Sequence, residues 1–218
     1  MTERTPTIRA RSFWLAWTVA TCLFGVMCGF AAVSNRFPGD LTIALRIQDL
    51  DDAGFGPLAS FANAAGDTLW GGLLTITFAA AFLLRKRLPE AAVISLTLVP
   101  RALRQAVAMA VARPRPPADL LQIRDDAFGY SFPSGHATGA MLLYGAMFLL
   151  VGTLIPDKRL VFSFRVLCVL MIIATGVARV YCGVHWPSDV AGGYLFGLLA
   201  LAPLSLFYSF LLGRVPTR

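Results

Sequence analysis

The sequence has little charge and few of the side chains that usually carry catalysis. Only 14% of its 218 residues are charged, and it contains two histidines and four cysteines. Soluble domains are about a quarter charged, so an ordinary soluble domain is excluded. The cysteines make no disulfide framework. We interpret Cys22, Cys28 and Cys168, which lie inside apolar runs, as small packing residues, and place Cys182 near the surface.

Long apolar runs take the place of the missing charge, and 57% of the residues are hydrophobic. Crossing a hydrocarbon core of about 30 Å takes roughly 17 to 25 residues. The pattern predicts an all-α polytopic membrane protein, a single domain over residues 1–218. The six predicted transmembrane helices are residues 13–33, 68–84, 91–112, 137–155, 160–178 and 190–213. The first run could be a signal peptide, but its length favours an uncleaved anchor.

The sequence between the first two runs, residues 37–66, is too polar to cross a membrane. Its apolar positions predict a short helix in the interface plane, broken at residues 54–57. Two glycine pairs within the apolar runs have the spacing of close helix packing. We expect both pairs, Gly25 with Gly29 and Gly193 with Gly197, to pack inside the protein.

The net charge of +7 would suit a nucleic acid, but its distribution indicates membrane topology. If the amino terminus is cytoplasmic, ten basic residues lie at cytoplasmic ends and six on the opposite side, as the positive-inside rule requires. No nucleic-acid partner is therefore expected, and both histidine segments face outward. The ten are Arg4, Arg9, Arg11, Arg85, Lys86, Arg87, Lys158, Arg159, Arg214 and Arg218, and the six are Arg36, Arg46, Arg113, Arg115, Arg124 and Arg179.

The first histidine belongs to the segment Phe-Pro-Ser-Gly-His, residues 132–136, which has the features of a helix start. Ser134 can cap the helix, and the free backbone amides at a helix amino terminus bind anions. Gly135 allows an anion to approach the backbone closely, and His136 in the first turn can reach it. The segment predicts an anion site.

The second histidine lies just before another predicted helix. Pro187 is favoured at the first helical position, which leaves His185 outside the helix and Asp189 in its first turn. A carboxylate there can hold one ring nitrogen and leave the other as a nucleophile. Arg179 ends the preceding run on the same side. An interfacial belt of aromatic and basic residues is the alternative interpretation.

A proline-rich exit, residues 112–117, presents Arg113 and Arg115 from a stiff backbone. Arginine suits phosphate because its planar fork donates paired hydrogen bonds; an anchor for anionic lipid is the alternative. The two histidines with Asp189 could instead bind a metal, but no pair has the spacing of a zinc motif, and the arginines would repel a cation. We expect no metal.

These three segments, in this order on six predicted spans, resemble the type 2 phosphatidic acid phosphatase (PAP2) superfamily, over residues 13–213. The resemblance implies a lipid phosphatase that needs no metal or other cofactor. In it, His185 attacks phosphorus and forms a phosphohistidine, Asp189 holds the ring, and His136 protonates the leaving group. The phosphate-binding residues implied are Arg115, Arg179, Ser134 and Gly135, with Arg113 as a further candidate.

The first segment departs from the family pattern of Lys, six residues, then Arg-Pro. The lysine position is Ala108, but Arg104 lies one helical turn earlier on the same face. We predict that Arg104 supplies the missing charge; the alternative is a structural role beside Arg101. The third segment opens with Ala178 where the family usually has serine, which puts one hydroxyl contact to phosphate in doubt.

The implied substrate is a membrane lipid with a phosphate monoester or diphosphate, such as undecaprenyl diphosphate, phosphatidate or phosphatidylglycerol phosphate. A compact chain resembles the bacterial members, so we expect a multi-pass protein of the bacterial inner membrane, with its active site on the extracytoplasmic face. Transfer of the phosphoryl group to another acceptor and a non-hydrolytic lipid-phosphate carrier are the alternatives. The intact His136, His185 and Asp189 argue against a carrier.

Overall fold

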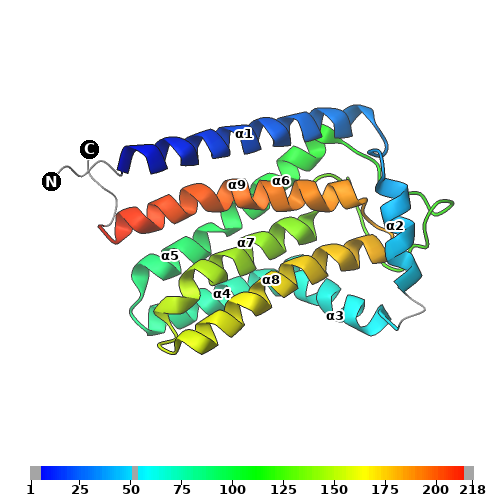
Figure 1. Ribbon diagram of the computed structural model, residues 1–218. Coiled ribbons are helices and arrows are strands. Elements are labelled where there is room, and N and C mark those ends of the chain that lie inside the picture. Colours follow the sequence, from blue (N-terminus) through cyan, green and yellow to red (C-terminus); the bar gives the residue numbers. More distant parts are fainter. Residues whose placement is uncertain (1–5, 51–53, 214–218) are drawn as a thin grey trace.

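Long helices lie side by side with α7 (Gly135–Leu150) among them, and the short helix α2 (Asp40–Gln48) lies across one end of the bundle (Figure 1). The computed structural model describes residues 6–50 and 54–213, and over these ranges it contains helices and no strands. The elements are α1 Pro6–Val33, α2 Asp40–Gln48, α3 Gly56–Gly66, α4 Thr68–Leu84, α5 Leu88–Leu96, α6 Leu98–Val111, α7 Gly135–Leu150, the 3-10 turn η2 Val151–Thr153, α8 Lys158–Tyr181 and α9 Pro187–Leu211. Some residues counted in the charge distribution, Arg4, Arg214 and Arg218, lie outside the described residues.

The prediction of an all-α membrane protein is confirmed for the described residues. Five of their helical segments are long and apolar enough to cross a membrane, or six if α3 and α4, bent by 57°, form one broken span. One of the five is the predicted span 91–112, which consists of α5 and α6 and has Thr97 between them. The predicted segment 37–66 contains two helices, α2 and α3, separated near the expected break.

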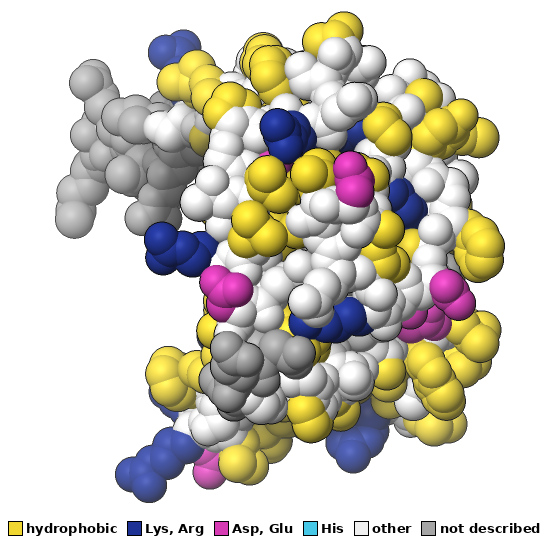
Figure 2. All heavy atoms as spheres, turned by 90° about the vertical axis from the view of Figure 1, so that its right-hand side faces the viewer, with side chains coloured by type: hydrophobic (Ala, Val, Ile, Leu, Met, Phe, Trp, Pro, Cys, Tyr) yellow, Lys and Arg dark blue, Asp and Glu magenta, His cyan; other side chains and the backbone are white. Residues whose placement is uncertain are grey.

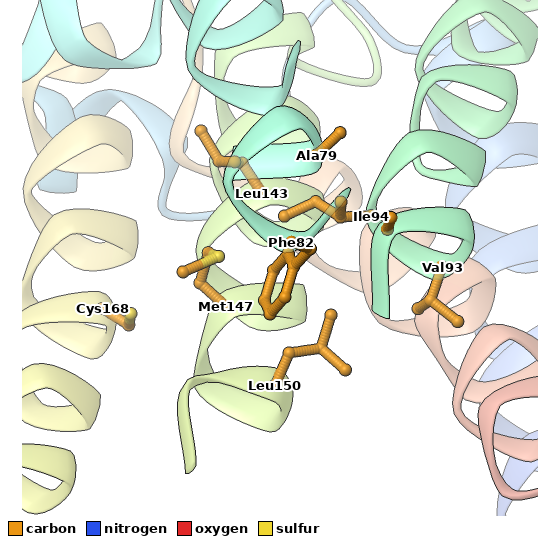
Figure 3. Close-up of a cluster of buried hydrophobic side chains, with 9 residues drawn as sticks. Ala79, Phe82, Val93, Ile94, Leu143, Met147, Leu150 and Cys168 are labelled. Carbon is orange, nitrogen blue, oxygen red and sulfur yellow. The ribbon is translucent and has the colours of Figure 1, made fainter. Parts of the chain in front are cut away.

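The largest hydrophobic cluster packs α4, α5 and α8 around the carboxyl-terminal half of α7 (Figure 3). Phe82 and Ile94 are fully buried there against Leu143 and Met147. Cys168 lies in the same cluster, which confirms it as a packing residue. Because this cluster fills the half of the bundle away from the start of α7, the opposite end is left for polar side chains.

The amino-terminal halves of α7 and α9 approach closely because α9 carries glycine where they meet. A Cβ atom on Gly193 would lie 2.7 Å from the Ser134 carbonyl oxygen, and one on Gly197 would lie 2.7 Å from the Met141 Cβ atom. This pair packs internally, as predicted. The same prediction is wrong for Gly25 and Gly29 of α1, because no atom lies within 4 Å of either Cβ position.

Candidate active site

The first histidine segment starts α7 as the sequence predicts. Ser134 is the N-cap, and its Oγ accepts a hydrogen bond from the Ala137 amide at 3.4 Å. The Ser134 amide donates to the Asp189 carbonyl at 3.0 Å, which ties this segment to the start of α9. Gly135 is the first residue of α7, so its amide belongs to the anion-binding end of the helix.

The second histidine segment starts α9, with Pro187 at the first helical position. Asp189 Oδ2 accepts a hydrogen bond from the Trp186 amide at 2.8 Å and lies 3.6 Å from His185 Nδ1. Ser131, which the sequence analysis missed, lies 3.4 Å from the same ring nitrogen and donates a short hydrogen bond to Asp189. The only feature of the sequence that pointed to Ser131 was its hydroxyl, directly before the first histidine segment. Asp189 therefore faces His185, with Ser131 beside both.

The other ring nitrogen of His185, Nε2, lies 3.1 Å from Arg115 Nη1. A guanidinium has no acceptor, so Nε2 must accept and the ring proton must be on Nδ1, toward Ser131 and Asp189. Burial lowers the pKa of His185 to about 4, against the raising effect of Asp189 and with a further lowering by Arg115 and Arg179. The ring is therefore neutral near pH 7 and has a lone pair on Nε2.

Arg115 connects the loop between α6 and α7 to the loop that carries His185. Its Nη1 donates to the Val184 carbonyl at 2.8 Å, its Nε to the Gly129 carbonyl at 3.1 Å and its Nη2 to the Phe128 carbonyl at 2.9 Å. Burial, and then the charges of Arg179 and Arg104, lower the pKa of Arg115 to about 10, against the raising effect of Asp189 and Asp125. Arg115 stays charged near pH 7, and three predicted phosphate-binding arginines lie close enough to repel one another.

Arg179 is buried at the end of α8 and is held by two residues that the sequence analysis did not select. Its Nη1 donates to Asp125 Oδ2 at 2.6 Å and to the Asn63 side-chain oxygen. Its Nε is buried without a hydrogen-bond partner. Burial alone would raise the pKa of Asp125, but the hydrogen bond and charge of Arg179 lower it. In this structure a carboxylate thus binds the guanidinium that we expect to bind phosphate.

Arg104 reaches the start of α7, whereas Arg101 does not. Arg104 Nη1 donates to the Pro133 carbonyl at 3.1 Å, and a Cβ atom on Gly135 would lie 3.2 Å from Arg104 Cζ. Arg101 Nη2 donates to the Asp67 carbonyl at 3.0 Å. Only the first of these two guanidiniums therefore lies against the predicted anion site.

Arg113 has a different place from the one expected. Its side chain is fully buried; Nη1 lies 2.5 Å from Asp189 Oδ1, and Nη2 lies 3.0 Å from Asp40 Oδ2. Both terminal nitrogens are held by carboxylates. Arg113 is therefore a partner of Asp189 in this structure, and its role as a further phosphate ligand stays a prediction. Asp40, the first residue of α2, was not selected from the sequence because it is far from the three segments along the chain.

His136 has its own carboxylate neighbour. Its Nε2 lies 3.9 Å from Oδ2 of Asp67, which caps α4 by accepting the Leu69 amide at 2.8 Å. Figure 2 looks onto this end of the molecule: basic and acidic side chains are scattered among hydrophobic ones, and no histidine is seen at the surface in this view. His185 is buried and His136 is partly buried, and each lies beside an aspartate.

The cluster suits an anion better than a cation. Among residues 6–50 and 54–213, no group of three or more His, Cys, Asp and Glu side chains could hold a metal ion. A cavity of about 490 Å³ opens beside Arg115. Its lining residues are Asn35, Arg36, Pro114, Arg115, Pro117, Leu120 and Trp186.

Cys182, expected near the surface, is buried, and burial raises the pKa of its thiol.

Part of the chain is similar to several curated enzymes. It is 34% identical over 74 residues to phosphatidylglycerophosphatase B of Bacillus subtilis, which is 32% of this chain and 35% of that protein. It is 40% identical to lipid A 1-phosphatase of Rhizobium etli over 31% of this chain and 25% of that protein. It is 36% identical to undecaprenyl-diphosphatase of Sulfolobus acidocaldarius over 31% of this chain and 29% of that protein. The matches thus span about a third or less of each relative.

The similarity in fold covers nearly the whole chain. The crystal structure of a transmembrane PAP2 type phosphatidylglycerolphosphate phosphatase from Bacillus subtilis aligns with a TM-score of 0.54, over 95% of this chain and 98% of that one, at 20% identity. The PAP2 superfamily model matches residues 89–212, which include both histidine segments and the arginines before them. The chain that brings these histidines and arginines together therefore belongs to the PAP2 superfamily.

Proposed function

We propose that the protein hydrolyses a lipid phosphate monoester or diphosphate through a phosphohistidine on His185. The observation that carries this proposal is the state of the His185 ring. Arg115 Nη1 lies 3.1 Å from Nε2 and requires a lone pair there, while Ser131 and Asp189 lie on the Nδ1 side. A neutral, oriented imidazole beside a guanidinium is a nucleophile placed where a phosphate would bind.

The first half of the reaction transfers the phosphoryl group to the protein. The lone pair of His185 Nε2 forms a bond to phosphorus while the bond between phosphorus and the lipid oxygen breaks. His136 donates a proton to that oxygen, so the lipid leaves as an alcohol or a phosphate. The ring of His185 then carries a positive charge, which faces the Asp189 carboxylate. Asp67, 3.9 Å from His136 Nε2, can pair with the protonated form of the acid.

The second half releases inorganic phosphate. A water molecule attacks phosphorus and gives its proton to His136, while the bond between phosphorus and Nε2 breaks and restores the lone pair. Both steps spread charge over the equatorial phosphate oxygens, and guanidiniums and helix amides stabilise such charge. We assign this binding to Arg115, Arg179, Arg104, Ser134 and the Gly135 amide.

Substrate binding displaces one internal contact. Arg179 Nη1 is held by Asp125 at 2.6 Å, so a phosphate that binds this guanidinium competes with that carboxylate. The phosphate has the advantage of charge, because it also meets Arg115 and Arg104. The exchange replaces one anion by another, so the arginines are not left unpaired at any stage.

The substrate class follows from the position of the site and from the relatives. The three relatives are named as phosphatases of phosphatidylglycerophosphate, of lipid A at its 1-phosphate and of undecaprenyl diphosphate, all of them lipid phosphates. The catalytic end of this chain lies where its apolar helices begin or end, which is the depth of a lipid headgroup. We therefore assign a lipid phosphate rather than a soluble phosphate ester.

The proposed topology is a multi-pass protein of the bacterial inner membrane. We count α3 and α4 as one broken span, which gives six spans, and we place α2 in the interface plane. The positive-inside rule then puts α2 and the catalytic end on the extracytoplasmic side.

The test is release of inorganic phosphate by the purified protein in detergent from dioctanoyl phosphatidate, phosphatidylglycerol phosphate and undecaprenyl diphosphate. Quenching during turnover with a radiolabelled substrate should trap an acid-labile, alkali-stable phosphoprotein, because phosphohistidine has that stability. EDTA should leave turnover unchanged. Turnover without any phosphoprotein, or turnover lost in EDTA and restored by a metal ion, contradicts the proposal.

A further inference from the structure

Asp40 is a buried carboxylate outside the three segments that suggested the site. Only 2% of its surface is exposed. Its oxygens accept hydrogen bonds from the Phe37 amide at 2.6 Å, the Ser188 amide at 2.9 Å, the Ser188 hydroxyl at 2.7 Å and Arg113 Nη2 at 3.0 Å. A buried charge is tolerated only when it is paired and hydrogen-bonded. Asp40 meets both conditions.

Arg113 connects Asp40 to the catalytic carboxylate. Its Nη1 lies 2.5 Å from Asp189 Oδ1 and 2.8 Å from the Ser188 hydroxyl, and its guanidinium lies 4.9 Å from the centre of the Phe37 ring. Asp189 Oδ1 is therefore held by Arg113, and the other oxygen, Oδ2, is the one that faces His185. The bridge thus fixes Oδ1 of the carboxylate, while the Trp186 amide and Ser131 bind Oδ2.

The charges explain why a second carboxylate is useful. Arg113 and Asp189 alone would form a neutral pair. The guanidinium would then cancel the negative charge of Asp189, which stabilises the His185 ring when that ring becomes positive. With Asp40, the cluster of two carboxylates and one guanidinium has a formal charge of −1. When His185 acquires a positive charge on phosphorylation, the cluster and the ring together become neutral. The low dielectric of a buried site makes this compensation larger than it would be in water.

We propose that Asp40 is a positioning residue for phosphorylation of His185, acting through Arg113 on the orientation and charge of Asp189. This inference rests on the proposed function, because it concerns the step that forms the phosphohistidine. Asp40 lies outside residues 89–212, which match the family model. The helix α2 thus contributes to catalysis from a segment that the match does not cover.

The test variant is Asp40→Asn, which keeps the size and one oxygen acceptor but removes the charge. Rapid quenching with radiolabelled dioctanoyl phosphatidate measures the rate of phosphohistidine formation. We expect this rate to fall about tenfold or more, the size that the loss of one charge-assisted hydrogen bond gives in a rate. The KM and the inhibition by inorganic phosphate should stay unchanged, because Asp40 does not touch the phosphate. A residue that only stabilised the fold would not lower the phosphorylation rate while leaving the KM and the phosphate inhibition unchanged.

Two variants serve as controls. Ser188→Ala removes the hydroxyl between Arg113 and Asp40 and leaves every charge in place, so its loss of rate should be smaller than that of Asp40→Asn. Asp157→Asn changes the N-cap of α8, which lies at the other end of the bundle (Figure 1). The Asp157 carboxylate accepts a hydrogen bond from the Arg159 amide at 2.7 Å. The variant should phosphorylate at the wild-type rate.

The possible outcomes separate this inference from the proposed function. If wild-type protein forms no phosphohistidine, the proposed function fails. If wild type forms it and Asp40→Asn does so equally fast, or loses activity only through a raised KM, the inference alone is overturned. If Asp40→Asn does not fold, Arg113→Lys tests the same bridge, because an ammonium lacks the fork that holds two carboxylates. A wild-type phosphorylation rate in that variant also overturns the inference.

Discussion

The two histidines have different surroundings, and the proposed function gives them different tasks. His185 is buried, and Nε2 is the nitrogen that carries its lone pair, whereas His136 is half-buried beside Asp67. A nucleophile has no substitute, so His185→Ala should lower turnover about a thousandfold or more and abolish the phosphoprotein. His136→Ala should cost about a hundredfold or more on an alkyl phosphate.

The leaving group distinguishes the two roles. A p-nitrophenyl phosphate needs little help from an acid, so His136→Ala should lose much less activity on it than on an alkyl phosphate. His185→Ala should lose both activities equally. Phosphate release from the two esters measures this directly. Equal losses in His136→Ala on both esters contradict its role as the acid.

The acid side of the pH profile should report His185. Its pKa is lowered from 6.5 to about 4, mainly by burial, and Asp189 works in the opposite direction. The lone pair is therefore kept as the pH falls below 6.5 and is lost only near pH 4. In Asp189→Asn, the group that raises the pKa is gone, so the acid limb of the phosphorylation rate should move to lower pH.

The comparison of the two proteins isolates the ring, because the substrate phosphate titrates identically in both. Phosphohistidine formation measured by rapid quenching across the acid range gives both limbs. A limb that is the same in wild type and Asp189→Asn means that another group controls it.

Arg104 should matter for substrate binding, whereas Arg101 should matter for stability. Arg104 lies against Gly135, and Arg101 is held by the Asp67 carbonyl, close to Gly71 and Gly139 of neighbouring helices. We expect Arg104→Ala to raise the KM about tenfold or more, since a charge-assisted contact to phosphate is worth about 1.5 to 3 kcal/mol. Steady-state kinetics and melting temperature separate the two effects.

The family lysine provides a rescue experiment for the same residue. Ala108 is buried one turn along α6, so Arg104→Ala combined with Ala108→Lys returns a charge to the family position. Recovery of the KM supports the substitution of one charge by the other. Full activity in Arg104→Ala, with only a lower melting temperature, means that Arg104 is structural.

At the scale of the helices, the meeting of α7 and α9 is the contact that assembles the site. Gly193 faces the backbone at the start of α7, where a Cβ atom would come within 2.7 Å of a carbonyl oxygen. Gly193→Ala should therefore cost about 1–3 kcal/mol, as overpacking does, and should lower activity by separating Ser134 from α9. Gly25→Ala, on an open face of α1, is the matched control and should be neutral or gain up to about 1 kcal/mol.

Thermal unfolding in detergent and phosphate release measure both consequences of the glycine changes. The two variants make the same chemical change in helices of similar length. Equal stability of Gly193→Ala and Gly25→Ala would contradict the prediction, because it would mean that α7 and α9 can move apart at no cost in free energy.

For the whole molecule, the charge distribution predicts which end faces outward. Single cysteines at Asp119→Cys, in the loop between α6 and α7, and Lys158→Cys, at the start of α8, report opposite ends of the bundle. In a cysteine-free background, a membrane-impermeant thiol reagent applied to intact cells should label Asp119→Cys alone. Labelling of Lys158→Cys alone inverts the topology. The native Cys182 cannot replace these reporters, because it is buried.

Local signals in the sequence were sufficient for the helix starts and for the pairing of His185 with Asp189. Ser134 caps α7, Pro187 begins α9, and Asp189 faces His185. Each of these depends on contacts within a few residues, and the rules for helix ends determine such contacts. The apolar runs likewise predicted the long helices, because their length follows from the thickness of the membrane.

The tertiary structure decided which distant residues join the site. Ser131 reaches Asp189, Asp40 reaches Arg113 beside it, and Asp125 and Asn63 reach Arg179. All four come from loops and helices that no local pattern relates to the histidines.

Arg113 and Arg115 show the same division between sequence and structure. They are two residues apart in one proline-rich segment, yet Arg113 is buried between two carboxylates and Arg115 lies beside His185. The sequence by itself determined the membrane helices, the family and the two histidines. Only the packing of the helices decided which arginine lies beside His185 and which lies between carboxylates, because a side chain's partner depends on what the rest of the fold brings next to it.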